Sequence, residues 1–515
     1  MKKKTIWGIA AMVAAAALAL TGCTGGGGNA GTTGDGDGSA PTTLSIGTVF
    51  DKTGWEIGQS GAGFNAPFFS AVYDSLVLID ENSKPYGQLA TSIDTSDDEL
   101  TYTFHLQDGV TFSDGEKFDA DAAIANFDYL RKSAYTAPAY VNVAKTTKVD
   151  DATVEVTMTK PDPGFLFNLG LGNSYMVSPK VLSDAKYTQE TSPEGGSGAY
   201  TFDASKSTAG QDYYFTKNPD AWQADKFPWE SVEIHVIADS TAMSNAMSTG
   251  VINVEFASWS DQLKADADAN NWTITDVMSG WSGLMLADRT GDKFTPLGNL
   301  KVRQALNMAF DRDAITKAAN DPNGVATNQV FSTIDPELDK LYPYDVAKAK
   351  QLLTEAGYPD GFTLTLPTMS LFASTAATVK QSLEQIGIKV EVQNLDPATY
   401  NQQVFAGNFP VYMAFLQLYG NPTKTIADFF TPGMSNPFDS AKDIPELQSL
   451  FTDLHTAGAD VDAIAQKFNS YATENAWFVV WNHGASYYVT VPGITIRPVQ
   501  GLYVPNLEQF LPAGS

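Results

Sequence analysis

The chain has 515 residues and a formal charge of −27, with 59 acidic side chains against 32 basic ones. It is longer than one compact core supports, roughly 250 to 300 residues, so two or more lobes are expected. The negative charge repels nucleic acid and anionic lipid headgroups, which excludes both as partners of the folded body. Because Cys23 is the single cysteine, an internal disulfide is excluded as well.

The N-terminal residues follow the order of a secretory signal. Three lysines at positions 2–4 precede an apolar run over 9–20, which is too short for a membrane span of about 20 residues. The run ends at Leu20-Thr21-Gly22-Cys23, a tetrad that resembles a bacterial lipobox. That resemblance implies a signal peptide over 1–22 and a lipid group on the Cys23 thiol. We therefore expect an extracytoplasmic protein that is anchored to the cell membrane by its lipid.

The segment that follows reads as a tether. Residues 23–42 are rich in Gly, Thr, Asp and Asn and cannot bury apolar surface, so we expect a flexible linker. Within it, Asp35-Gly36-Asp37-Gly38 looks like a calcium loop but lacks the closing Glu, and a solvated linker is the preferred interpretation. No second apolar stretch approaches the length of a membrane span, so the chain cannot itself be a permease.

The region near residue 100 has strand periodicity. Residues 100–106 alternate polar and apolar side chains, and Gln107-Asp108-Gly109 forms a turn before 110–112. This pattern predicts an antiparallel hairpin. Asp119 then opens a predicted helix that extends to Leu130, and residues 153–158 alternate again as a further strand.

A second region alternates helix and strand. Asp345 is a predicted N-cap for a helix that ends at Gly357, and residues 362–366 then alternate as a strand. A further helix over 376–386 and a strand over 388–392 follow. Strand, helix and strand at this spacing predict a right-handed crossover unit, and hence an α/β lobe.

Several motifs together resemble one known family. They are Leu100-Thr101-Tyr102-Thr103-Phe104-His105-Leu106, Val110-Thr111-Phe112-Ser113-Asp114-Gly115, Gly195-Gly196-Ser197-Gly198-Ala199-Tyr200, Asn218-Pro219-Asp220-Ala221-Trp222, the stretch from Lys301 to Arg312, and Gly357-Tyr358-Pro359-Asp360-Gly361-Phe362. In this order they resemble the family 5 extracellular solute-binding proteins, which include oligopeptide, dipeptide and nickel binders of ABC importers. The matches run over most of the chain.

The resemblance implies a two-lobed periplasmic-binding-protein-like α/β fold of type II, with an extra inserted subdomain and a hinge of two crossings. By analogy, the first lobe takes residues 43–75, 180–278 and 484–515. The inserted subdomain takes 76–179, and the second lobe takes 279–483. Ligand would lie in the cleft between the lobes, and closure requires only a higher affinity for the closed form.

The function that the resemblance implies is that of a substrate-binding lipoprotein of an ABC importer. We expect a monomer that captures an oligopeptide-like solute and delivers it to permease subunits driven by cytoplasmic ATPases. An oligosaccharide ligand is the alternative within the same role. A secreted lipoprotein hydrolase is the alternative of another class, but the sequence has no zinc-protease His motif, no nucleophile elbow and no paired metal ligands. An adhesive protein would carry repeats, and none is found. No cofactor or metal is expected.

The ligand residues are predicted from aromatic content and from the resemblance. Leu418 stands where related peptide binders carry an Asp, which weakens the case for a short peptide with a free amino terminus. It leaves room for longer peptides held through their backbone, or for oligosaccharides stacked on aromatic rings. The predicted ligand residues are Trp259, Trp281, Asp288, Tyr419 and Trp481. For Trp281 and Trp481, which lie near the implied hinge crossings, core packing is the alternative role.

Overall fold

The structure, a computed structural model, describes residues 41–60, 63–187, 192–433, 435–502 and 504–514. The expected signal peptide over 1–22, the lipidation of Cys23 and nearly all of the linker over 23–42 lie outside the described residues. None of the helices in the described ranges combines the length and the apolar character that a bilayer crossing demands.

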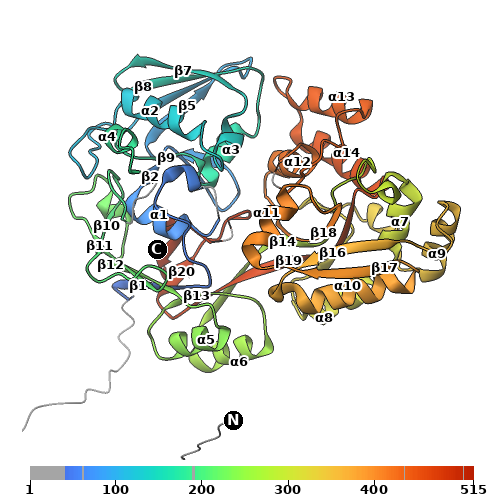
Figure 1. Cartoon of the computed structure of the whole chain (residues 1–515). Coiled ribbons are helices and arrows are strands. Elements are labelled where there is room, and N and C mark those ends of the chain that lie inside the picture. The colour runs from blue at the N-terminus through green and yellow to red at the C-terminus, as the bar shows by residue number, and fades with distance from the viewer. Residues whose placement is uncertain (1–40, 61–62, 188–191, 434, 503, 515) are drawn as a thin grey trace, which may run out of the picture. The chain divides into compact units, whose positions relative to one another are not determined.

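A mixed sheet is the main scaffold of the described residues (Figure 1). Its strands are β1 (Thr43–Thr48), β10 (Tyr200–Phe202), β11 (Asp212–Lys217), β12 (Ser231–Val236), β13 (Val254–Ala257), β14 (Thr273–Leu286), β15 (Val325–Ala326), β18 (Val411–Gln417) and β19 (Phe478–Thr490). They follow the order β10-β11-β12-β1-β13-β19-β14-β18, and β15 pairs with β19 beside this path. β1 lies parallel to β12 and β13, whereas the other pairs are antiparallel. The predicted α/β class is confirmed.

Strands β14 and β19 form a long antiparallel ribbon, called here the β14/β19 ribbon. Its register runs from Thr273 opposite Thr490 to Met285 opposite Phe478. Near one end, Tyr488 belongs to a core cluster that also contains Ile46 and Ile234. The other end belongs to two further clusters: Leu284 and Val479 pack among the side chains of one, and Met285 and Val480 among those of the other. The ribbon therefore connects separate hydrophobic cores.

A separate antiparallel sheet contains the strands predicted near residue 100. It consists of β5 (Ala90–Thr95), β6 (Thr101–Leu106), β7 (Val143–Asp150) and β8 (Thr153–Met158), in the order β5-β6-β8-β7. The strand predictions for 100–106 and 153–158 are confirmed. The hairpin is wrong, because β6 pairs with β5 and β8 and not with residues 110–112. Gly109 turns the chain at φ +76°, and the buried Phe112 packs its ring against Phe118 at 6.1 Å.

The predicted helices and the crossover unit are present. Their bounds are α2 (Ala120–Leu130), α9 (Val346–Glu355), β16 (Thr363–Thr368), α10 (Ala373–Gln385) and β17 (Lys389–Asn394). β16 and β17 pair in parallel, which confirms a strand, helix, strand crossover. The side chain of Asp119 accepts a hydrogen bond from the Ala122 amide, and that of Asp345 accepts one from Lys348, as N-caps do. Gly357, at φ +91°, follows the end of α9 in the left-handed conformation.

The remaining helices and short strands surround these sheets. The helices are α1 (Ala66–Val72), α3 (Phe165–Asn168), α4 (Pro179–Leu182), α5 (Ser240–Ser248), α6 (Asp261–Asn270), α7 (Leu300–Met308), α8 (Arg312–Ala319), α11 (Pro397–Phe405), α12 (Pro422–Phe430), α13 (Pro445–Leu454) and α14 (Val461–Glu474). The short strands are β2 (Asp74–Ser75), β3 (Val77–Ile79), β4 (Pro85–Gly87), β9 (Tyr175–Met176), β20 (Ile494–Ile496) and β21 (Phe510–Pro512). The domain boundaries given above stay a prediction; the implied crossings at 278/279 and 483/484 fall inside β14 and β19.

Candidate functional site

A cavity of about 410 Å³ lies where the β14/β19 ribbon passes β18 and the end of β13. This volume is in the range of small-molecule sites, roughly 300 to 1,000 Å³. The lining residues are Ala257, Ser258, Trp259, Ser279, Gly280, Trp281, Ser282, Ala319, Asp321, Phe415, Leu416, Gln417, Asn482, Gly484, Ala485, Ser486 and Tyr487. Chain segments more than 200 residues apart thus form one wall, because β14 and β19 pair directly.

Two glycines face each other in the wall of the cavity. Gly280 of β14 is the register partner of Gly484 of β19, and the pairing is irregular on the β14 side between Met278 and Gly280. A Cβ atom on Gly484 would meet nothing within 4 Å except the Asp321 Oδ2, at 3.6 Å. Without side chains at these two positions, the strand backbone borders the cavity directly, and glycine in a strand often marks such a close approach.

Aromatic rings supply the apolar part of the lining. The ring of Trp259 lies 5.2 Å from that of Tyr487, and Trp281 lies edge-on to Phe429 at 5.6 Å. Phe415 is 46% exposed although it is a large apolar side chain, and its other face stacks on Phe372 at 4.6 Å. Flat rings that are held by neighbouring rings offer rigid surfaces on which a ligand can stack.

The polar lining is neutral except for one carboxylate. Among the described residues that line the cavity, Asp321 alone is charged. The Tyr487 hydroxyl donates a hydrogen bond to its Oδ1, and the Ala485 amide donates one to its Oδ2 at 3.0 Å. Burial raises the pKa of Tyr487, and its hydrogen bond to Asp321 and the Asp321 charge raise it further, so the phenol remains a donor. Ser279 and Ser486 share a hydrogen bond of 2.6 Å across the ribbon.

The comparisons with known proteins identify the family. Residues 84–436 match the family described as bacterial extracellular solute-binding proteins, family 5. The chain belongs to this family. Solved structures that share the fold include DppA from Helicobacter pylori in complex with the peptide STSA, with a TM-score of 0.77, 21% identity, and coverage of 91% of this chain and 98% of that one. NikA from Brucella suis in complex with Fe(III)-EDTA has a TM-score of 0.74, 20% identity, and coverage of 91% and 99%.

Among curated relatives, the glutathione-binding protein GsiB of Escherichia coli (strain K12) is 32% identical over 341 residues, which cover 63% of this family 5 chain. The match spans 64% of the length of the curated protein. The two-lobed periplasmic binding-protein fold expected from the sequence motifs is confirmed by the structural neighbours.

Two of the predicted ligand residues of this family 5 protein lie in the wall of the cavity. Trp259 follows the end of β13, and Trp281 lies on β14 next to Gly280. Trp281 is only 1% exposed and also belongs to a core cluster, so core packing, the alternative role considered for it, is observed. That they contact a ligand stays a prediction.

The other three predicted residues lie outside the cavity lining. Asp288 is fully buried, and its carboxylate accepts hydrogen bonds from the backbone amides of residues 292, 293 and 294, so it shapes the loop after β14. Trp481 is buried against Phe310, with ring centroids 5.4 Å apart. Tyr419 packs in a small apolar cluster, but its hydroxyl donates a 2.9 Å hydrogen bond to Gln417, which lines the cavity.

Leu418 and His483 each lie next in sequence to a lining residue, and both are buried. Leu418 is fully buried in an apolar cluster, so its side chain is withdrawn from the cavity. His483 is buried, its Nε2 lies 2.8 Å from the Gln329 carbonyl oxygen, and burial lowers its pKa. Within the described ranges, no group of three or more His, Cys, Asp and Glu side chains is placed to hold a metal ion.

Sequence reasoning missed most of the lining. Phe415 and Gln417 line the cavity and lie in the segment compared above with related peptide binders, close to Leu418. Asp321 begins the sequence Asp-Pro-Asn-Gly, which predicts a turn but gives no indication of a binding residue. Gly484 carried a usable signal, because a glycine between strand residues often marks a place where something approaches the backbone.

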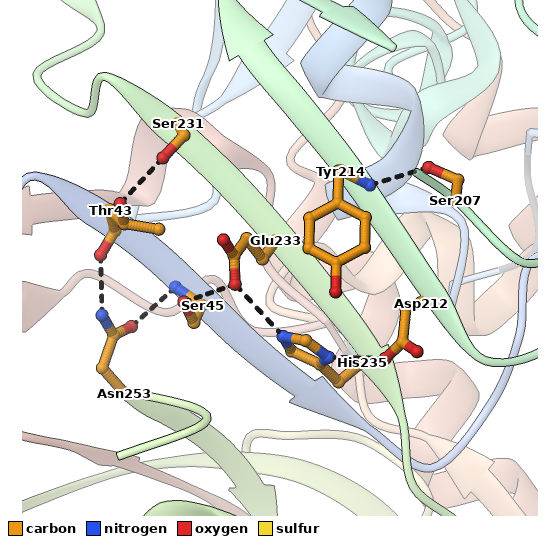
Figure 2. A network of polar contacts seen from close by, with 9 residues as sticks. All are labelled: Thr43, Ser45, Ser207, Asp212, Tyr214, Ser231, Glu233, His235 and Asn253. Atoms are coloured by element: carbon orange, nitrogen blue, oxygen red, sulfur yellow. Dashed lines mark hydrogen bonds and ion pairs between the residues drawn. The ribbon is translucent and has the colours of Figure 1, made fainter. Parts of the chain in front are cut away.

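A polar network covers β1, β11 and β12 away from the cavity (Figure 2). His235 Nδ1 lies 2.7 Å from Asp212, its Nε2 lies 3.4 Å from Glu233, and Ser45 donates to the same Glu233 at 3.4 Å. Alternate residues of these strands face the first core cluster, so this face carries the polar half of the pattern. The two carboxylates contact opposite nitrogens of one imidazole and cannot share a metal with it. The network therefore joins strands.

Another cavity, of about 720 Å³, lies beside α2 and is lined among others by Glu56, Tyr129, Lys132 and Tyr135. It contains no predicted ligand residue. Two of its polar lining residues pair with each other, because the Tyr129 hydroxyl donates to Glu56. We therefore place the candidate site at the cavity beside the β14/β19 ribbon.

Proposed function

We propose that this protein is the substrate-binding lipoprotein of an ABC importer. It captures an extracellular, oligopeptide-like solute in the cavity beside the β14/β19 ribbon and delivers it unchanged to permease subunits that cytoplasmic ATPases drive. It works as a monomer. The observation that carries this proposal is a cavity in which strand backbone at Gly280 and Gly484 is bordered by aromatic rings and neutral polar side chains.

The chemistry of the lining supports binding of an extended chain. Backbone groups next to a strand can hydrogen-bond to a peptide main chain, while the rings of Trp259 and Phe415 take up side chains without reading their identity. The ligands of two similar proteins agree with this class: DppA was solved with a peptide, and GsiB is a glutathione-binding protein. The cavity lies on strands that connect separate cores, so a bound solute contacts the segment about which the cores can rotate.

The solute is expected to co-purify with the protein. Native mass spectrometry of protein isolated from its own organism should show the chain together with one bound mass, because a closed cleft releases its ligand slowly. Released solute added back to stripped protein should raise the melting temperature and should be recovered intact. The Trp259→Ala variant, purified in the same way, should contain less of the bound solute.

Three outcomes separate the alternatives. A bound peptide supports the proposal as stated, and a bound oligosaccharide would keep the transport role but change the ligand class. Chemically altered solute would contradict the proposal and favour the hydrolase alternative.

Lipid attachment at Cys23 is part of the proposal. The Cys23→Ser variant should leave the membrane fraction and collect in the medium or periplasm, since the thiol that carries the lipid is gone. Fractionation followed by immunoblotting measures this, with Cys23 intact as the control. Folding should not change, because residue 23 precedes the first described strand. Membrane retention of the Ser variant would count against the anchor.

A further inference from the structure

Among the described residues that line the cavity, only Asp321 is charged. Asp321 follows α8, whose C-cap residue Asn320 is left-handed at φ +54°, and this turn brings the carboxylate to the ribbon. Within the described part of the chain, no Lys, Arg or His side chain forms an ion pair with Asp321. Asp321 is half-buried in the cavity wall, so its carboxylate is accessible to a cationic group of a ligand.

The hydrogen bonds of Asp321 hold it in place and leave one site on its Oδ2. The Tyr487 hydroxyl and the Asn323 amide donate to Oδ1, and the Ala485 amide donates to Oδ2. A carboxylate offers about four lone-pair sites, so one remains on the oxygen that faces Gly484. The Cβ position of Gly484, 3.6 Å from Asp321 Oδ2, is empty space on the cavity side. A ligand group can therefore reach Oδ2 while all three internal donors stay bound.

The surroundings of Asp321 favour a positive group. The paired rings of Trp259 and Tyr487 lie beside it, and aromatic faces attract ammonium and guanidinium ions. Two further acidic side chains make the potential near Asp321 more negative. Asp261 accepts a hydrogen bond at 3.1 Å from Asn320, the neighbour of Asp321, and the Asp276 charge raises the pKa of Tyr487. The chain as a whole carries −27, which steers cations toward it.

We propose that the cavity selects solutes that carry a positive charge, an ammonium or guanidinium group, and that Asp321 is its counter-ion. This inference rests on the proposed function and specifies the ligand of the same site. Anionic solutes are disfavoured, because none of the described lining residues is a cation that offsets the Asp321 charge.

Calorimetric titration of the full chain with charge-matched probes tests this proposal. The peptide probes are trialanine amide, which is cationic, its N-acetylated form, which is neutral, and N-acetyl-trialanine, which is anionic. The sugar probes are the glucosamine trisaccharide at mildly acidic pH and its fully N-acetylated form. A cationic probe should bind about tenfold or more tightly than its acetylated counterpart, as hydrogen bonds to charged groups imply. The two series distinguish a peptide from an amino sugar.

Asp321→Asn should remove this preference. The variant keeps an acceptor for the Tyr487 hydroxyl but loses the charge, so affinity for the cationic probe should fall about tenfold while that for the neutral probe stays. Asp313→Asn, an exposed change on α8 outside the cavity lining, removes the same charge and should leave the preference intact. The melting temperature of each ligand-free variant reports folding.

Equal or tighter binding of acetylated probes, a preference that survives in Asp321→Asn, or no binding of either cationic probe would overturn the inference. A neutral or anionic co-purifying solute would overturn it too, yet would leave the proposed transport role standing. Altered solute would instead contradict the proposed function.

Discussion

Gly484→Val should weaken solute binding at least tenfold while the protein stays folded. Residue 484 lies in β19 without a left-handed φ, and its Cβ would meet only Asp321 within 4 Å, so a β-branched side chain fits the strand. The valine methyl groups would then occupy the space beside Asp321 that the solute uses. Overfilling a packed site costs about 1 to 3 kcal/mol, so the affinity for the co-purifying solute should fall between about tenfold and 100-fold.

Titration of stripped protein with the released solute measures this effect, and thermal unfolding without solute tests the fold. Gly484→Ala should give a smaller loss, because one methyl group fills less of the cavity. Gly433→Val is the matched control: its Cβ also has open space around it, and it lies outside the lining. Full affinity in Gly484→Val would place the binding site elsewhere in the chain.

Glu255→Gln should stabilise the protein above neutral pH. Glu255 is 5% exposed on β13, and its register partner Val489 belongs to an apolar cluster with Met243 and Leu263 of the covering helices. Among the described residues, none forms a hydrogen bond with its Oε2. Burial, together with the charge of Asp266, raises the pKa of Glu255 to about 7.

The direction of the pH effect follows from this shift. The folded state binds the Glu255 proton more tightly than the unfolded state, whose group has the ordinary value of 4.5. The wild-type protein therefore loses stability as pH rises from about 4.5 to about 7, and the loss is complete above that range. Glutamine mimics the protonated form, so the variant should gain about 2 to 3 kcal/mol at pH 8 and almost nothing at pH 4.

Urea unfolding of both proteins across this pH range measures the gain. Glu230→Gln, at an exposed glutamate next to β12, is the control and should leave the pH profile unchanged. A gain of equal size at all pH values would mean that glutamine acts through packing rather than through loss of the charge.

Local patterns predicted local elements well. The alternation and the capping residues gave α2, α9, α10, β8, β16 and β17, because amphipathic periodicity and caps act within one or two turns of chain. Local patterns could not predict which strands pair with β6. Residues 110–112 continue the apolar alternation, yet Gly109 directs them into the core, and the neighbours of β6 are fixed by contacts between distant strands.

The candidate site was predicted only in part, for a geometric reason. In a strand, neighbouring residues face opposite sides, so a shift of one position decides between cavity and core. Asn482 lines the cavity whereas Trp481, chosen for its aromatic ring, faces the core. Residue type alone cannot show this, nor that Asp321 meets β19 across more than 160 residues of sequence.

The family resemblance predicted the overall fold, which periodicity could not. It gave the two-lobed fold, which composition and local patterns left open beyond the expectation of more than one lobe. The specific ligand chemistry came from neither source, because Leu418 departs from related peptide binders and the charge of the cavity comes from a turn that no motif covers.

The β14/β19 ribbon has a consequence for how this protein can diversify. Its residues serve as cavity wall and as connection between hydrophobic cores, so a substitution there alters affinity and the relative freedom of those cores together. Segments such as 257–259 and 415–417 border the same cavity from the ends of shorter strands. New cargo preferences are therefore expected to arise by exchange of these bordering segments, while the paired glycines of the ribbon stay unaltered.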